Sequence, residues 1–142
     1  MDKAILKQLV YDVNGAAIEV HKALGPGLLE SIYHKCLMYE LSLRKIPFTA
    51  EHEIPVIYKG ISVKAELYCD LLIEDTLVVE LKAVEKILPI HTAQILTYMK
   101  LLEAPMGLLL NFNVVNIFEN GQKTYVNELF RGLILDNNPL NW

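Results

Sequence analysis

Two carboxylates and an amine stand in a stretch that otherwise has the composition of a buried β-sheet. The segment CDLLIEDTLVVELKAVEK, residues 69–86, carries Asp70 in one apolar run and Glu80 and Lys82 in the next. Because side chains on a strand alternate between its faces, Glu80 and Lys82 share one face, about 6 to 7 Å apart along the backbone. The sequence therefore predicts a polar patch on one face of an apolar sheet.

Asp70 joins this patch only if the turn between the two runs has the right length. A hairpin centred on Asp75, with a three-residue turn over residues 74–76, pairs Asp70 with Glu80. Opposed residues of this kind have Cβ atoms about 4.5 to 5.5 Å apart. A strict two-residue turn would place the carboxylates on opposite faces, so we predict the three-residue turn or an equivalent bulge.

This trio suits the hydrolysis of phosphodiesters. Asp70 and Glu80 offer oxygen ligands to Mg²⁺ or Mn²⁺, and such an ion polarises a phosphate and lowers the pKa of a water molecule. Lys82 would orient that water or stabilise charge that develops on the phosphate. The alternative is an exposed sheet face on which Lys82 forms a salt bridge with Glu80 or Asp70, a spacing that chance readily produces.

Two predicted helices add further polar side chains. A helix expected over residues 90–103 carries Gln94 and Tyr98 one turn apart, hence on one side. They would brace a metal site or a substrate, or else form the polar edge of a packed helix. Glu30 and Tyr33 are likewise a turn apart in GLLESIY, where the helix dipole favours Glu30 whatever its function.

The first half of the chain changes from helical to β periodicity. Apolar residues at steps of three and four predict a helix over residues 3–24, which the GPG of residues 25–27 ends. A second helix is expected from Leu29 to about Lys45. From Phe48 to Ala83, alternating and β-branched residues predict three strands in an antiparallel meander.

The second half predicts strands after the helix that carries Gln94. Residues 106–112 have the pattern of a buried strand, and Asn120-Gly121 is typical of a two-residue hairpin turn between strands over 115–118 and 123–126. The order of elements predicts an α/β or α+β fold with a mixed central sheet flanked by helices.

Composition limits the class of protein and its partners. The 142 residues are 53% hydrophobic and 21% charged, which predicts one globular domain over residues 1–142. A net charge of −4 argues against broad, non-specific nucleic-acid binding, so such contacts would be local. The absence of a long apolar run and of a secretory signal predicts a cytoplasmic protein that does not bind membranes. The cysteines, histidines and serines lack the spacings of zinc sites or activated nucleophiles.

One further motif resembles a known family. Glycine, glutamate and tyrosine at Gly27, Glu30 and Tyr33 have the spacing that names the GxxExxY protein family, in GPGLLESIYHKCLMYEL. The chain is similar to that family, which is placed in the PD-(D/E)XK nuclease-like superfamily, from about Val10 to Phe118 through DLLIEDTLVVELKAVEKILPIHTAQILTYMKLL and GLLLNF. The resemblance implies a restriction-endonuclease-like core, a mixed four-stranded sheet with flanking helices.

The resemblance also implies roles for individual residues. Asp70 matches the metal-binding aspartate, Glu80 and Lys82 match the ExK pair, Glu30 matches an acidic residue from an early helix, and Gln94 with Tyr98 resembles the QxxxY element of RecB-like nucleases. Tyr33 is expected to support the site.

Two functions remain open. The first is a Mg²⁺- or Mn²⁺-dependent nuclease acting on nucleic acid, DNA before RNA, with Glu30, Asp70 and Glu80 around the metal, Lys82 as the catalytic lysine and Gln94 in support. The second is a binding or assembly module that keeps the fold but does not turn over a substrate, as a homo-oligomer or as a partner subunit. A melting temperature that rises with Mg²⁺, and no longer does so in Asp70→Ala, would distinguish the first from the second.

Overall fold

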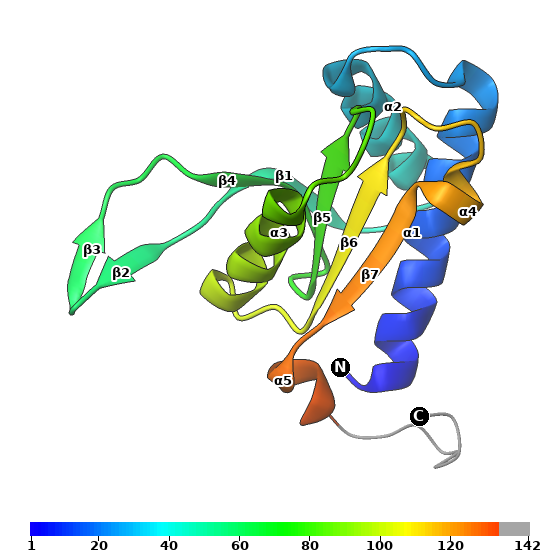
Figure 1. The fold of residues 1–142 in the computed structure, drawn as a ribbon. Helices are drawn as coiled ribbons and strands as arrows, with labels where there is room; N and C mark the ends of the chain where they lie inside the picture. The colour runs from blue at the N-terminus through cyan, green and yellow to red at the C-terminus, as the bar shows by residue number, and fades with distance from the viewer. Residues whose placement is uncertain (134–142) are drawn as a thin grey trace.

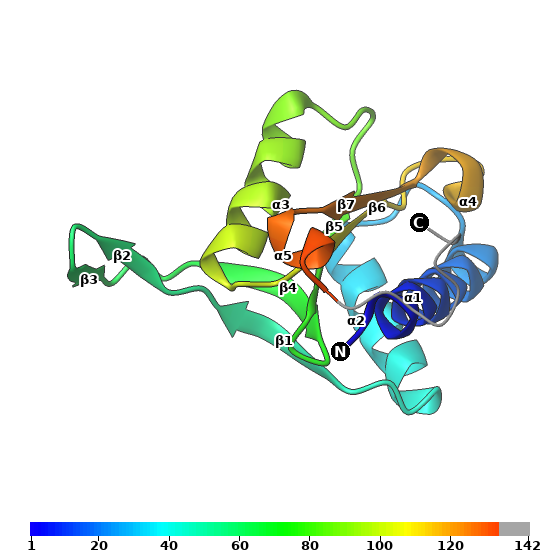
Figure 2. The same ribbon diagram turned by 90° about the horizontal axis from the view of Figure 1, so that it is seen from below.

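The computed structural model describes residues 1–133, and in them a central sheet has α1 and α2 on one face and α3 on the other (Figures 1 and 2). The helices are α1 (Lys3–Leu24), α2 (Glu30–Leu43), α3 (Pro89–Leu101), α4 (Ile117–Asn120) and α5 (Glu128–Arg131). The strands are β1 (Phe48–Glu53), β2 (Val56–Tyr58), β3 (Ile61–Val63), β4 (Tyr68–Ile73), β5 (Leu77–Lys82), β6 (Met106–Asn111) and β7 (Gln122–Val126). The predicted mixed sheet flanked by helices is confirmed.

The first two helices form where the apolar spacing predicts them. The side chain of Asp2 caps α1 by accepting the backbone N–H of Ile5. At the other end, Gly25 has a φ of +69°, a conformation that favours glycine. The apolar stripes of both helices, with Val13 and Leu37 fully buried, pack on the sheet in one continuous core.

The sheet has the strand order β1-β4-β5-β6-β7. β5 and β6 run parallel, whereas the other neighbouring pairs are antiparallel. Parallel neighbours need a crossover, and α3 provides it. Ile95 and Met99 of α3 pack so closely on β6 that a Cβ added to Gly107 would lie 2.6 Å from the Met99 sulfur. The sheet face under α3 is therefore close enough to α3 for polar side chains of both to meet.

The antiparallel meander predicted over residues 48–83 is wrong in its connections. β1 pairs with β4, while β2 and β3 form a separate two-stranded ribbon that extends from the body of the protein (Figure 2). Alternating side chains identify a strand but not its partner. The side chains of β2 and β3 are mostly exposed, so these strands have no apolar face that could join the main sheet.

The predicted hairpin at Asn120-Gly121 is also wrong. The side chain of Asn116 accepts the backbone N–H of Glu119 and so begins the short helix α4 where a strand was expected. Gly121 has a φ of −114°, whereas a type I′ turn needs positive φ. β7 begins after this helix and pairs with β6.

Gly121 is required by close packing. A Cβ at this position would lie 2.5 Å from the backbone oxygen of Asn111 and 2.7 Å from Cγ1 of Ile117. The same backbone is tied by a 2.8 Å hydrogen bond from Asn111 N–H to Gly121 O, so it cannot easily move aside. We expect Gly121→Ala to lower the free energy of unfolding by about 1 to 3 kcal/mol, measured by urea denaturation.

The control is Gly132→Ala, because an added Cβ there meets its nearest atom at an ordinary 3.6 Å. Equal losses of stability in the two variants would contradict the packing explanation for Gly121.

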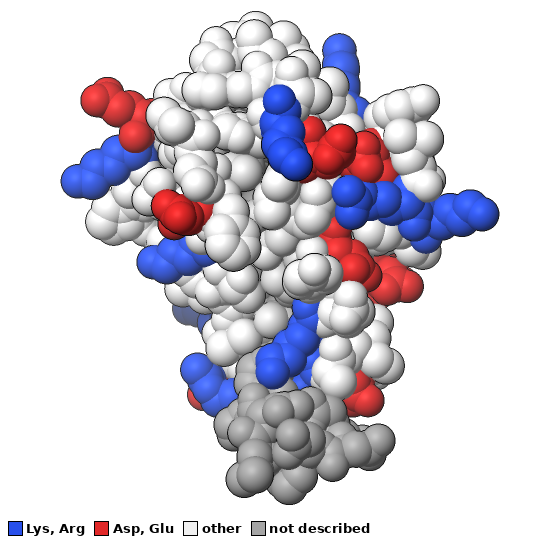
Figure 3. All heavy atoms as spheres, turned by 90° about the vertical axis from the view of Figure 1, so that its right-hand side faces the viewer, with Lys and Arg blue, Asp and Glu red and all other residues white. Residues whose placement is uncertain are grey.

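Charged residues are mixed on the face shown in Figure 3. Lysine and arginine alternate there with aspartate and glutamate, and neither sign forms a broad patch. That face lacks the electrostatic footprint of a general nucleic-acid-binding protein, so a cationic contact must be sought elsewhere.

In the described part of the chain, no helix is long and apolar enough to cross a membrane. The prediction of one domain over residues 1–142 stays a prediction, since residues 134–142 lie outside the described part.

Candidate active site

The hairpin formed by β4 and β5 sets the register of the two carboxylates. Leu71 pairs with Val79, and the strands are joined by residues 74–76. Asp70 and Glu80 are the next residues outward in this register, so they stand opposite each other. The predicted three-residue turn is confirmed, and with it the geometry that brings the carboxylates together.

All three predicted site residues of the sheet lie on the face that α3 covers. Leu72 and Val78 belong to the apolar core between the sheet and α3. Asp70, Glu80 and Lys82 are two or four residues away from these positions along their strands, so their side chains point to the same face. The apolar residues that alternate with them face α1 and α2 instead.

The carboxylates are held by backbone N–H groups of the opposite strand. Asp70 N–H donates to Glu80 Oε2 at 2.7 Å, and Leu81 N–H donates to Asp70 Oδ2 at 2.8 Å. Each side chain thus replaces a carbonyl as the acceptor of a cross-strand hydrogen bond. This arrangement fixes both carboxylates before any ligand binds.

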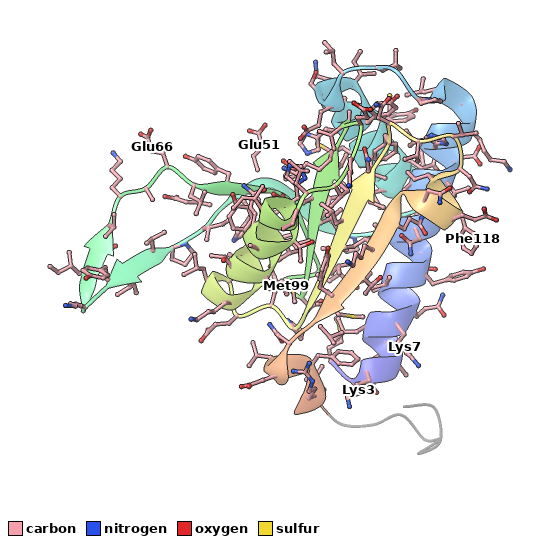
Figure 4. All side chains as sticks on the ribbon, viewed as in Figure 1. Lys3, Lys7, Glu51, Glu66, Met99 and Phe118 are labelled. Carbon is pink, nitrogen blue, oxygen red and sulfur yellow. The ribbon has the colours of Figure 1, made fainter. Side chains whose placement is uncertain are left out.

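β1, the strand on the other side of β4, is irregular at the residue opposite Asp70. β1 pairs regularly through Ala50 and again through His52, but Glu51, which stands opposite Asp70, has a φ of +48°. A positive φ is unfavourable for glutamate. The Glu51 side chain projects away from the ribbon (Figure 4). This break in the β1–β4 ladder leaves the Asp70 backbone available for hydrogen bonds to side chains.

Glu80 is the most strongly perturbed carboxyl group of this cluster. Its side chain is buried, with 4% of its surface exposed, so the alternative of an exposed salt-bridged face is wrong. Burial and, to a smaller extent, the charge of Asp70 raise the pKa of Glu80 to about 8, although a backbone hydrogen bond from Asp70 and the charge of Lys82 act in the opposite direction. The buried site therefore disfavours two ionised carboxylates side by side.

Lys82 is oriented by the helix that crosses above it. Its Nζ donates to Gln94 Oε1 at 3.2 Å. Tyr98, one turn further along α3, is buried, and burial followed by the charge of Glu80 raises its pKa, whereas a hydrogen bond with Gln94 lowers it. Gln94 thus links the ammonium group of Lys82 to the Tyr98 hydroxyl, and the predicted support from this pair is consistent with its position.

Glu30 and an unpredicted histidine approach from α2. Burial raises the pKa of the Glu30 carboxyl, as does the charge of Asp70, while Lys82 and His34 lower it. Glu30 is therefore near enough to these groups to interact with their charges. His34 Nε2 donates to the backbone oxygen of Asp70 at 3.1 Å. The sequence signal for His34 was its position one helical turn after Glu30.

Asn111 is a second residue near the site that was not predicted. It is buried and pairs with Lys82 across the parallel strands β5 and β6. Its side chain accepts the N–H of Val84 at 3.1 Å and donates to Val84 O at 2.9 Å. Asn111 therefore holds the chain that immediately follows Lys82, and this structural role fixes one end of the site.

Tyr33 does not belong to the carboxylate cluster. Its hydroxyl donates to Gly25 O at 2.6 Å and accepts the N–H of Leu28 at 3.1 Å, and its ring stacks on Phe112 with centroids 4.6 Å apart. It lies in the core on the side of α1 and α2. Tyr33 holds the loop that leads into Glu30, and its support of the site stays a prediction.

Tyr33→Phe should lower the free energy of unfolding by about 0.5 to 1.5 kcal/mol, because the Gly25 carbonyl and the Leu28 N–H, in part-buried hydrogen bonds, both lose their partner. Thermal denaturation measures this loss. Tyr39→Phe is the matched control on the same helix, since Tyr39 is 67% exposed. A Tyr33→Phe variant as stable as Tyr39→Phe would show that the loop does not depend on these hydrogen bonds.

The donor set of the carboxylate pair fits a hard divalent cation. Mg²⁺ in proteins commonly takes one or two carboxylates and completes its ligands with water and substrate phosphate. A hydrogen bond between the side chains of Asp70 and Glu80 requires that one of the two carboxyl groups is protonated. A bound cation is the other way to reduce the repulsion between two adjacent carboxylates. Within residues 1–133, no three His, Cys, Asp or Glu side chains are close enough to form a metal cluster, so Glu30 does not complete a three-residue ligand set.

A sequence model of the PD-(D/E)XK nuclease superfamily matches residues 7–124. The matched range includes every residue of the cluster described above. No curated protein and no solved structure matches the chain significantly.

Proposed function

Because the chain belongs to the PD-(D/E)XK nuclease superfamily, we propose that it is a metal-dependent nuclease that hydrolyses phosphodiester bonds in nucleic acid. Of the two nucleic acids, we propose DNA rather than RNA as its substrate. Membership of the superfamily supports a nuclease-like function, and its narrower assignment to the GxxExxY family stays a prediction. The observation that carries the proposal is the buried Glu80 opposite the half-buried Asp70, with Lys82 on the same sheet face.

We assign the metal ligands to Asp70 and Glu80, while Glu30, predicted as a third ligand, acts on the site through its charge. When bound there, Mg²⁺ or Mn²⁺ would polarise the scissile phosphate and lower the pKa of the attacking water. The chain fixes the two carboxylates through the N–H groups of Asp70 and Leu81. Ligands held in this way need little reorganisation when they bind a cation.

Lys82 is proposed as the catalytic lysine. Gln94 holds its ammonium group from above, at 3.2 Å. A fixed ammonium beside the metal ligands can orient the attacking water or stabilise the negative charge that develops on the phosphate. Gln94 acts as a positioning residue for Lys82, and Tyr98 restrains Gln94 in turn.

One observation favours the alternative of a binding or assembly module without turnover. The chain has a net charge of −4, which repels a polyanion unless a local cationic surface compensates. Such a module, as a homo-oligomer or a subunit bound to a partner, would keep the fold but would not cleave nucleic acid.

A cleavage assay tests the proposal. The substrates are plasmid, linear, single-stranded and branched DNA and an RNA of the same sequence, each with Mg²⁺, Mn²⁺ or EDTA. We expect cleavage by the wild type with metal and none with EDTA, and no cleavage by Asp70→Asn. Asp75→Asn is the matched control, because Asp75 lies in the exposed turn of the same hairpin.

Two results would count against the proposal. Absence of cleavage of every substrate by the wild type would leave the binding module as the better account. Equal cleavage by the wild type and Asp70→Asn would show that another site carries the activity.

A further inference from the structure

A cavity of about 490 Å³ lies between the beginning of α3 and the strands β6 and β7. Its walls include Lys86 and Pro89 from the loop and first turn of α3, Thr92 from α3, Leu109 from β6 and Lys123 from β7. None of the proposed site residues lines it, so it is distinct from the carboxylate cluster.

The strand register places the cavity beside that cluster. Glu80 of β5 pairs with Leu109 of β6, and Leu109 pairs with Lys123 of β7. Residues paired in this way form one row across the sheet, with side chains on the same face. Lys123 therefore shares the α3-covered face with Glu80, and two strand spacings of about 4.8 Å separate their backbones by ~10 Å.

Local contacts hold Lys123 at this wall. Its Nζ lies 5.5 Å from the ring centroid of Tyr125. The Tyr125 hydroxyl and Thr92 Oγ1 are 2.8 Å apart, which joins β7 to the first turns of α3. The ring is buried in the core between α3 and the sheet. The cationic wall is thus built on rigid elements.

The charge of the cavity is opposite to that of the protein as a whole. Among residues 1–133, those that line it include two lysines, Lys86 and Lys123, and no aspartate or glutamate. The positive end of the α3 dipole also opens here, through Leu88 and Pro89. In a chain with a net charge of −4, this is a local surface suited to an anion.

We infer that this cavity is a second phosphate subsite, which binds a backbone phosphate of the nucleic acid whose scissile phosphate lies at Asp70 and Glu80. The inference rests on the proposed function and specifies how its substrate is held. The phosphates of one strand recur about every 3.4 Å along the axis of duplex DNA, so ~10 Å along the axis corresponds to roughly three nucleotides. The substrate must therefore extend about that far beyond the cleaved bond.

Binding without catalysis tests the inference. Fluorescence anisotropy with labelled duplex and single-stranded DNA, in EDTA and over a range of salt, compares the wild type with Lys86→Ala, Lys123→Ala and Lys100→Ala. Each cavity variant should lower the salt dependence of log K by about 0.9 on duplex or about 0.7 on single strands. Lys100→Ala should leave it unchanged, because Lys100 is in the last turn of α3 and outside the cavity.

Substitution of single phosphates of the DNA by neutral methylphosphonates identifies the phosphate that binds in the cavity. We expect one phosphate whose neutralisation weakens binding to the wild type but not to Lys123→Ala. All three lysines are exposed, so the variants should keep the melting temperature of the wild type.

The outcomes separate this inference from the proposed function. If the wild type binds DNA without cleaving it, the proposed nuclease function is refuted. The comparison of the lysine variants then still decides whether the cavity binds a phosphate. Cavity variants that behave like Lys100→Ala overturn the subsite, even where cleavage is observed. A wild type that binds no nucleic acid overturns the subsite and the nuclease together. Micromolar binding of inorganic phosphate that requires Lys123 would instead identify a pocket for a small anion and overturn the inference.

Discussion

Lys82→Ala should slow metal-dependent cleavage by about 10²- to 10³-fold, the usual cost of removing a fixed group that stabilises charge in the transition state. Lys82 is the cation whose charge lowers the pKa of both Glu80 and Glu30, so it is electrostatically coupled to both carboxylates. Its loss removes that charge from the site while the backbone bonds that hold Asp70 and Glu80 remain. Single-turnover rates at saturating Mg²⁺ measure the effect.

Two further variants show whether the effect belongs to the catalytic step. Gln94→Ala should slow cleavage less than Lys82→Ala, because it frees the ammonium group without removing it. Lys64→Ala is the matched control, since Lys64 is exposed in the segment between β3 and β4. If Lys82→Ala retained a rate within threefold of Lys64→Ala, Lys82 would have no catalytic role.

The carboxylate pair could be predicted from the sequence because its geometry depends on short-range rules. Strand alternation puts Glu80 and Lys82 on one face, and the length of one turn decides whether Asp70 joins them. Both rules involve residues close together in the chain. The structure confirms the turn, and the burial of Glu80 excludes the simple exposed surface.

Features that depend on distant pairings could not be predicted. The prediction of an antiparallel meander was wrong because nothing in residues 48–63 indicates that β1 pairs with β4 and not with the next strand in the chain. The row from Glu80 to Lys123 requires β6 to lie between β5 and β7, and the mistaken hairpin at Asn120-Gly121 concealed that pairing. His34 was missed for a similar reason, since its partner is a backbone oxygen 36 residues away.

The stability of the protein should fall as the pH rises from about 4.5 to about 8. Below this window Glu80 is protonated in both states. Within it, the unfolded chain loses the proton at its ordinary pKa of 4.5, whereas the folded protein keeps it until about pH 8. Deprotonation therefore favours unfolding, by at most about 1.4 kcal/mol per pH unit for one group, and the loss levels off above the folded pKa.

Metal should reverse this trend, because a cation binds the ionised carboxylate and competes with the proton. We expect saturating Mg²⁺ to raise the melting temperature more at pH 9 than at pH 6. Thermal denaturation at the two pH values, with Mg²⁺ or with EDTA, measures the difference. A Mg²⁺ effect of the same size at both would mean that the ion binds groups already ionised at pH 6, and not Glu80.

Glu80→Gln is the decisive variant, because the amide oxygen can still accept the Asp70 N–H at the position where Glu80 Oε2 accepts it at 2.7 Å. The amide does not titrate and is a poor substitute for a carboxylate in binding Mg²⁺. The variant should therefore lose the decline in stability between pH 4.5 and 8 that is due to Glu80, and it should lose the response to Mg²⁺ at pH 9. If only the pH dependence disappeared and the Mg²⁺ response persisted, Glu80 would be a buried structural acid and the metal ligands would lie elsewhere.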